Sequence, residues 1–196
     1  MALTKLNNKS VANVTTLPVA LGDMVLVSSA NASSSAYIEF TLGNYKEYQF
    51  YFVNIHPSTD AVDFEFNLSI DSGSNYNVTK TSTSFVAYHQ ENDTASGVTY
   101  ATAMDLAQST AYQNITDEVG NGADESVSGY LQLFNPSSNV FVKHYISTVN
   151  NYYKGDAPNN HYIAGYANTV SPLTNIRFQM SSGNIDAGTI LMYGIN

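Results

Sequence analysis

The chain has 196 residues, of which 43% are hydrophobic and only 12% charged, and its formal net charge is −9. Seven basic residues against sixteen acidic ones argue against a partner that is a nucleic acid or an anionic membrane surface, because such binding depends on Lys and Arg. The absence of cysteine excludes disulfides, Cys-ligated zinc and thiol nucleophiles.

The N-terminal stretch MALTKLNNKSVANVTTLP lacks the long apolar segment of a signal peptide, and no run approaches the roughly 20 residues that span a bilayer. We therefore expect synthesis in the cytosol and no membrane insertion. Residues 1–20 show no strand-like alternation and are predicted to form an N-terminal arm. The arm either packs on a neighbouring protein or is a disordered tail. Residues 21–196 are predicted to form a single domain.

Alternation of apolar and polar residues with a period of two dominates the first half of the domain. It predicts strands over residues 36–42, with Ile38, Phe40 and Leu42 on one face, and over 46–53. Residues 43–46 (GNYK) between them are typical of a hairpin turn. A half-buried strand is predicted over residues 61–69, after a segment in which Pro57 prevents a strand from continuing.

The second half repeats this pattern, with strands expected over residues 126–134, 139–149, 161–169, 175–181 and 189–195. Residues 101–108 could make one helical turn. Two polar stretches, residues 72–97 and 150–160, are predicted to be long exposed loops. Many short antiparallel strands with Gly, Asn, Ser and Pro turns predict an all-β fold, an antiparallel β-sandwich of about 8–10 strands, with a jelly roll as the expected topology.

The segment TILMYGI (residues 189–195) follows the polar turn SSGNIDAG and is strongly apolar. We expect it to pair inside a sheet, where its backbone groups are satisfied, with Tyr193 as an anchor.

The four histidines have no spacing that marks a preformed metal pair. His144 is predicted to lie on the apolar face of its strand with Val142 and Ile146, as a hydrogen-bonded core residue. His89 precedes Glu91 and Asp93. These side chains could be metal ligands or an acid–base set, but a solvated loop is the favoured interpretation.

Two acidic segments could bind a cation. DSGSN (Asp71 to Asn75) partly resembles a calcium loop but lacks its further acidic ligands, so a turn capped by Asp71 is favoured. TDEVGNGADES (residues 116–126) offers four carboxylates around two glycines, although a solvated acidic loop is again the favoured interpretation. No catalytic motif, cofactor-binding motif or metal-binding motif is present, so no catalytic residue, cofactor or metal is assigned.

The tyrosines cluster around two predicted hairpins, Tyr45 to Tyr51 and Tyr152 to Tyr166. Tyrosine combines a large rigid contact area with a hydrogen-bonding tip, which favours protein and sugar contacts, although it also simply suits strands. The candidate contact surface, for a ligand or a partner, consists of Tyr152, Tyr153, His161 and Tyr162.

The sequence resembles a family of small virion structural proteins of marine tailed bacteriophages. The resemblance spans nearly the whole chain and is carried by the ending SSGNIDAGTILMYGI and by these segments: MALTK, SSSAYIEF, YQFYFVNIHPSTD, DSGSNYNVTK, AYHQEND, DLAQSTAYQN, SGYLQLFNPSS and VKHYI. It implies a virion location, other virion proteins as partners and a homotrimer. It implies no catalytic residue.

Three classes of function follow. The first is a non-enzymatic virion component on the particle surface, either a tail- or fibre-associated host-attachment module or a capsid decoration (cement) protein. The second is a carbohydrate-binding module for cell-surface glycans, which would use the tyrosines near residues 150–162. The third is a polysaccharide hydrolase, for which no carboxylate pair is nominated.

Overall fold

The computed structural model describes residues 24–196, and within this range the chain contains twelve strands and no helix. The strands are β1 (Val25–Asn31), β2 (Ile38–Thr41), β3 (Glu47–Pro57), β4 (Phe64–Ser69), β5 (Lys80–His89), β6 (Ser96–Tyr100), β7 (Gln113–Asn114), β8 (Val127–Phe134), β9 (Lys143–Tyr153), β10 (Ala157–Ala167), β11 (Asn175–Met180) and β12 (Ile185–Ile195). No helix in this range could cross a membrane.

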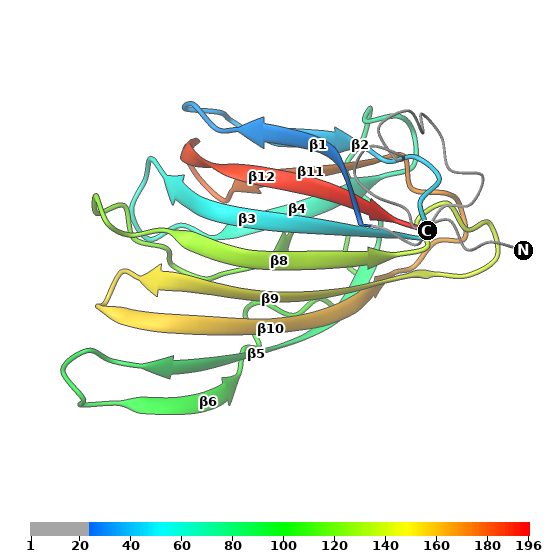
Figure 1. Ribbon diagram of the computed structural model, residues 1–196. Helices are drawn as coiled ribbons and strands as arrows, with labels where there is room; N and C mark the ends of the chain where they lie inside the picture. The colour runs from blue at the N-terminus through cyan, green and yellow to red at the C-terminus, as the bar shows by residue number, and fades with distance from the viewer. Residues whose placement is uncertain (1–23) are drawn as a thin grey trace, which may run out of the picture.

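The strands form two antiparallel sheets that pack as a sandwich. The larger sheet has eight strands in the order β1-β12-β3-β8-β9-β10-β5-β6, and the smaller has four in the order β2-β11-β4-β7. Figure 1 shows the long strands of the larger sheet running side by side, with β2, β11 and β4 behind β1, β12 and β3. The predicted all-β sandwich is confirmed. The expected jelly-roll topology is not confirmed, because a jelly roll has eight strands in two sheets, whereas the two sheets here contain eight and four strands.

Aromatic rings fill the space between the two sheets. Phe178 on β11 lies near Phe50 and Phe52 of the opposite sheet, with ring centroids 5.4 and 5.3 Å away. It also contacts Phe64 on the neighbouring strand β4, at 5.9 Å. These rings are fully or almost fully buried, so burial of aromatic surface is a major source of the stability of the sandwich.

Alternation placed the core residues correctly on several strands. Ile38, Phe40 and Leu42 are buried while Glu39 and Thr41 between them are exposed. The strand over residues 189–195 also pairs as expected, because β12 is hydrogen-bonded to β1 on one side and to β3 on the other.

The hairpin predicted at residues 43–46 is wrong. β2 belongs to the four-stranded sheet and β3 to the eight-stranded one, so the segment between them crosses from one sheet to the other. A hydrogen bond stabilises this crossing segment: the backbone N–H of Gly43 donates to the hydroxyl of buried Tyr48. A turn signal marks the change of direction but cannot tell whether the two strands pair.

Two predictions about strand burial are also wrong. β4 is buried on both faces rather than one, and Asn67 on the side away from the core is completely covered. On β9, His144 and Ile146 are exposed, while Tyr145 and Val149 face the core. Both faces of β9 carry apolar residues, so alternation alone could not assign the inner one.

Both predicted long loops contain strands. β5 and the first residues of β6 lie within residues 72–97, and residues 150–160 form a tight hairpin in which β9 and β10 pair almost to the turn. The one helical turn considered for residues 101–108 is an irregular segment with hydrogen-bonded turns. The predicted arm, residues 1–20, lies outside the described residues.

Candidate functional site

One face of the eight-stranded sheet is turned away from the smaller sheet and is here called the outer face. Strand register places a row of mainly aromatic side chains straight across it. From β6 to β12 this central row contains Tyr100, Phe85, Tyr162, Thr148, Tyr130, Tyr51 and Leu191.

Two further rows flank the central one. The row toward the β9–β10 turn contains Val98, Ala87, Asn160, Asn150 and Ser128. The row on the other side contains Thr83, Ala164, Ile146, Gln132, Gln49, Tyr193 and Leu26. None of the side chains in the three rows is charged. The outer face therefore presents aromatic rings, amides and hydroxyls side by side.

The rings of the central row form two groups separated by the single strand β9. Phe85 and Tyr162 stack in parallel, with centroids 4.8 Å apart and an interplanar angle of 13°. Tyr51 lies between Tyr130 of the same row and Tyr193 of the flanking row, with centroids 6.3 and 5.7 Å away. Each ring limits the rotation of its neighbour, so the groups present ordered surfaces.

Several large apolar side chains of this face remain in contact with water. Phe85 is 40% exposed, Tyr100 52% and Val98 71%. Near the opposite edge, Tyr51 and Tyr193 line an apolar hollow of about 380 Å³ together with Met24, Val53 and Leu191. Contiguous exposed apolar surface of this kind marks interaction sites in soluble proteins.

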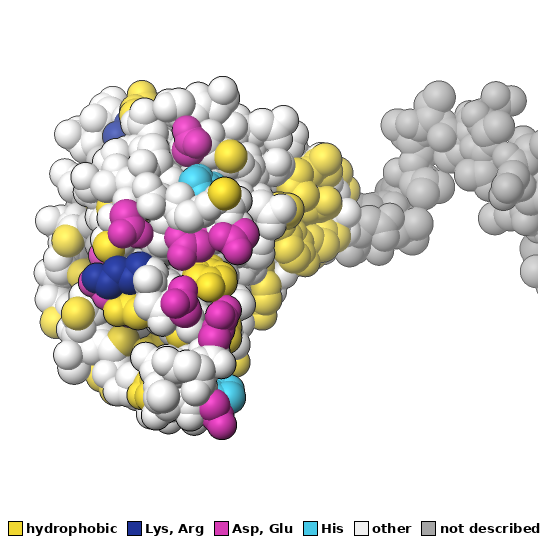
Figure 2. Space-filling view, turned by 90° about the vertical axis from the view of Figure 1, so that its left-hand side faces the viewer, with side chains coloured by type: hydrophobic (Ala, Val, Ile, Leu, Met, Phe, Trp, Pro, Cys, Tyr) yellow, Lys and Arg dark blue, Asp and Glu magenta, His cyan; other side chains and the backbone are white. Residues whose placement is uncertain are grey.

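The hairpin end of the sandwich, where β9 turns into β10, is acidic. Figure 2 shows acidic side chains gathered over this end, next to a basic patch. A hollow of about 380 Å³ opens here; its lining residues are Glu91, Asp124, Ser126, Ser128, Asn150, Asn151, Tyr152 and Pro158. Because Ser128 and Asn150 also belong to the outer face, the hollow is continuous with it.

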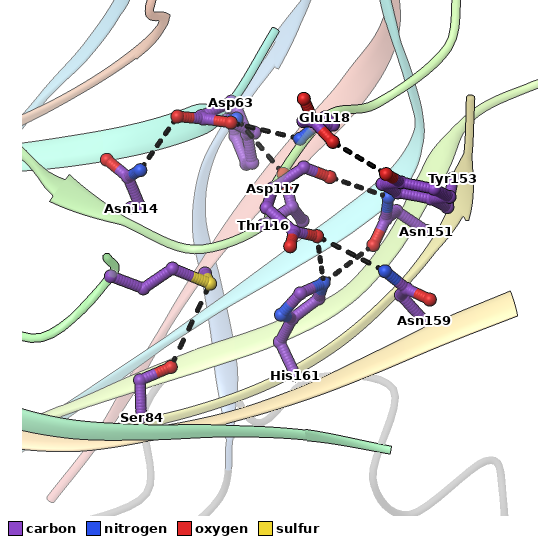
Figure 3. A network of polar contacts seen from close by, with 12 residues as sticks. Asp63, Ser84, Asn114, Thr116, Asp117, Glu118, Asn151, Tyr153, Asn159 and His161 are labelled. Atoms are coloured by element: carbon purple, nitrogen blue, oxygen red, sulfur yellow. Dashed lines mark hydrogen bonds and ion pairs between the residues drawn. The ribbon is translucent and has the colours of Figure 1, made fainter. Parts of the chain in front are cut away.

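A polar network fixes the acidic segment 116–126 to this end of the sheet (Figure 3). His161 is completely buried, and its Nε2 lies 2.9 Å from Asn151 Oδ1 and 3.2 Å from Asp117 Oδ1. Asn159 also donates to Asp117, at 3.2 Å. Burial acts to raise the pKa of Asp117, but the hydrogen bond and charge of His161 outweigh it and lower that pKa.

The carboxylates of Glu118 and Asp63 also accept hydrogen bonds that hold this segment. Glu118 accepts hydrogen bonds from Tyr153 and Lys154, each at 2.7 Å, and these bonds lower its pKa. Asp63 accepts from the Glu118 backbone N–H at 3.0 Å and from Asn114 at 2.8 Å. The carboxylates therefore hold the segment in place, and few of their oxygens remain for a cation.

Asp63, Asp117 and Glu118 also line a hollow of about 490 Å³ with Asn114, Met104 and the 99–103 segment. Burial raises the pKa of Asp63, whereas the pKa of Asp117 is lowered. Two neighbouring carboxyl groups with opposite shifts are the arrangement that acid–base enzymes use.

The four residues of the predicted contact surface do not share a face. Tyr162 lies on the outer face, and Tyr152 lines the acidic hollow and donates to Glu91 at 3.2 Å. Tyr153 points to the opposite side, onto Glu118, and His161 is buried in the core. His161 therefore cannot be part of an exposed surface, and its role is to hold the polar network.

The other predicted ligand residues are accounted for by local contacts. His89 and Asp93 form an exposed pair at 2.9 Å, as expected for a solvated loop. Asp71 caps its turn, accepting from the Asn75 backbone at 2.9 Å, and its pKa falls to about 2, chiefly through the side-chain hydrogen bond of Asn75. Within residues 24–196, no group of three or more His, Cys, Asp or Glu side chains is placed to hold a metal ion.

Sequence reasoning missed most of the outer face. It singled out Tyr162 because tyrosines cluster nearby, but not Phe85 or Tyr130, whose neighbours in space are far away in sequence. Alternation could have placed each ring on the side opposite the core, but only strand register joins them into a row.

Comparisons with known proteins add no family: no protein-family model matches the chain, and neither the curated proteins nor the solved structures contain a match. The molecule is therefore defined by its fold and surfaces, as an all-β sandwich with one broad, largely aromatic face whose three described rows carry no charged side chain.

Proposed function

We propose that the chain is a non-enzymatic structural protein of a tailed bacteriophage particle, made in the host cytoplasm and displayed on the particle surface as a host-attachment module. The observation that carries the proposal is the outer face, which exposes rings such as Phe85 and Tyr100 and lacks charge in its three rows. A face of this kind lowers its free energy when a partner covers it. The resemblance to virion proteins of marine phages supplies the biological setting.

The low overall charge supports assembly in many copies, because copies with few charged groups repel each other weakly when packed closely. We propose a homotrimer attached to other virion proteins, with a place on the tail or its fibres. A capsid decoration protein is the alternative place on the same particle.

The experiment is immunoelectron microscopy of purified particles, with antibodies raised against the folded protein. Labels at the tail tip support the attachment module, and a dense, even label over the capsid supports decoration. Antibodies that bind the outer face should also block adsorption of the phage to host cells. Purified particles that lack the protein would refute the proposal.

A second candidate is a polysaccharide hydrolase, and the observation that favours it is the hollow where Asp63 and Asp117 have opposite pKa shifts. Against it, both oxygens of Asp63 accept hydrogen bonds that fasten the acidic segment. Release of reducing sugar from host polysaccharide, lost in both Asp63→Asn and Asp117→Asn, would establish the hydrolase and displace the first proposal.

A further inference from the structure

The rings of the outer face, of which Phe85 and Tyr100 are exposed and Tyr162, Tyr130 and Tyr51 half-buried, are suited to flat, weakly polar ligand surfaces. The sugar ring of a polysaccharide presents C–H groups on its faces, which pack against the electron-rich face of an aromatic ring. Phe85 and Tyr162 offer one stacked pair, and Tyr130 with Tyr51 offers a second group across β9. At about 4.8 Å per strand, the two groups are about 10 Å apart between Tyr162 and Tyr130.

The polar groups between the rings match sugar hydroxyls. A hydroxyl both donates and accepts hydrogen bonds, and so do amide and hydroxyl side chains. Thr148 lies within the central row, and Asn150 and Ser128 lie in the row beside it. Asn160 donates to the Tyr162 hydroxyl at 2.7 Å, which fixes the ring next to this polar strip.

Charge distinguishes the ligand class. A nucleic acid or a strongly charged protein surface is selected by complementary charges, and none of the side chains in the three rows is charged. At the end of the face, the carboxylates of Glu91 and Asp124 line the continuous hollow and would repel an acidic glycan. The face therefore suits a ligand that is rich in hydroxyls and has no charge.

The dimensions suit a chain rather than a single sugar. The central row crosses five strand-to-strand intervals from Tyr100 on β6 to Tyr51 on β3, which is about 24 Å at 4.8 Å each. The hollow beside Asn150 and Tyr152, at about 380 Å³, has the size of a small-molecule site. An extended polymer can lie along the row, and the hollow opens beside the middle of that row, next to β8, β9 and β10.

From these observations we infer that the outer face binds a neutral polysaccharide chain, with the rings of Tyr162 and Tyr130 as the two stacking platforms. This inference rests on the proposed attachment function and names the class of its receptor. The inferred site lies in the middle of the sheet rather than at the tyrosines of the β9–β10 hairpin. Tyr153 and His161 are not part of it.

The test uses the full-length chain on a glycan array, followed by affinity electrophoresis in gels that contain hydroxyethylcellulose, laminarin or mannan, with alginate as the acidic comparison. We expect retardation by at least one neutral polysaccharide and none by alginate. Tyr130→Ala and Tyr162→Ala should each weaken binding at least about tenfold, whereas Tyr130→Phe, which keeps the ring, should bind nearly as well as the parent. The matched control is Phe141→Ser, which removes an exposed ring on the β8–β9 connection, outside the three rows, and should stay within about twofold.

The outcomes separate this inference from the proposed function. No binding on the array or in any gel overturns the inference, while the protein can still be found on particles by the antibody label. Equal binding by all variants places the glycan elsewhere and also overturns it. A change in oligomeric state of Tyr130→Ala without any glycan binding would show that the face joins copies of the chain instead.

Discussion

The Nζ of Lys80 lies 2.6 Å from Oδ1 of Asn67, deep between the start of β5 and the smaller sheet. It also donates to the Val78 carbonyl at 2.8 Å, and no carboxylate of residues 24–196 forms an ion pair with it. Lys80 is completely buried, and this burial lowers its pKa from 10.5 to about 7. Burial at this contact thus shifts the Lys80 amine toward its neutral form, compared with an exposed lysine.

This contact predicts a pH-dependent stability. Between pH 7 and the ordinary lysine pKa, the unfolded chain holds a proton on Lys80 that the folded protein lacks, so the free energy of unfolding should rise with pH in this window. The slope contributed by Lys80 should approach about 1.4 kcal/mol per pH unit. Urea unfolding at several pH values between 7 and 9.5 measures it.

The matched variants are Lys80→Met, which keeps the stem without the amine, and Lys46→Met on the surface. The first should lose most of the slope and the second should keep it. Some slope should persist in Lys80→Met, because burial also lowers the pKa of Lys143. Identical slopes in the parent and Lys80→Met would contradict the assignment.

The contact between Asp117 and His161 predicts a second pH dependence, at acidic pH. The pKa of Asp117 is lowered in the folded protein, so its carboxylate contributes stability above the ordinary value of 3.8, and this contribution is lost as the pH falls through the folded pKa. Asp117→Asn should therefore cost about 1–2 kcal/mol at pH 7, and the deficit should shrink in acid.

Chemical unfolding of the parent and the variant at pH 7 and at about pH 3 measures this difference. Asp93→Asn is the control, because its pair with His89 is exposed and should contribute less than about 0.5 kcal/mol. A deficit of Asp117→Asn that is the same at both pH values would indicate lost shape complementarity rather than lost charge.

A third prediction concerns Gly188 at a bulge of β12, which has a φ of +111°. A Cβ at this position would lie 2.4 Å from the Asn54 carbonyl oxygen on β3. Gly188→Ala should destabilise the protein by at least about 2 kcal/mol, seen as a lower midpoint of thermal unfolding. Gly97→Ala, whose Cβ would meet only ordinary contacts at 3.5 Å, should change stability little. Equal midpoints for the two variants would show that the bulge can relax.

The sequence could predict the fold class because alternation is a local property. Phe50 and Phe52 follow it, and both face the core. It could not predict that Glu65 and Asn67 are covered, because the covering segments come from elsewhere in the chain. It also misplaced His144, since the choice of inner face on β9 depends on the opposite sheet.

The candidate site was less accessible to prediction for the same reason. Tyr162 was named from local tyrosine density, but its partner Phe85 is joined to it only by the register of β5 and β10. His161 was grouped with the exposed tyrosines although it occupies the other face of the same strand. Alternation separates His161 from Tyr162, but deciding which one faces the core needs the second sheet.

The last prediction tests the aromatic core that joins the two sheets. Phe178 lies within 6.4 Å of rings on three other strands: Phe40 on β2, Phe50 and Phe52 on β3, and Phe64 and Phe66 on β4. Phe178→Ala leaves a cavity at this junction and should cost about 3–5 kcal/mol, or about 6–20 °C in Tm. Phe178→Leu refills part of the volume and should cost less, while Phe141→Ala on the exposed β8–β9 connection should change Tm by no more than a degree or two. If Phe178→Ala had the same Tm as the parent, contacts other than this ring cluster would have to hold the two sheets together.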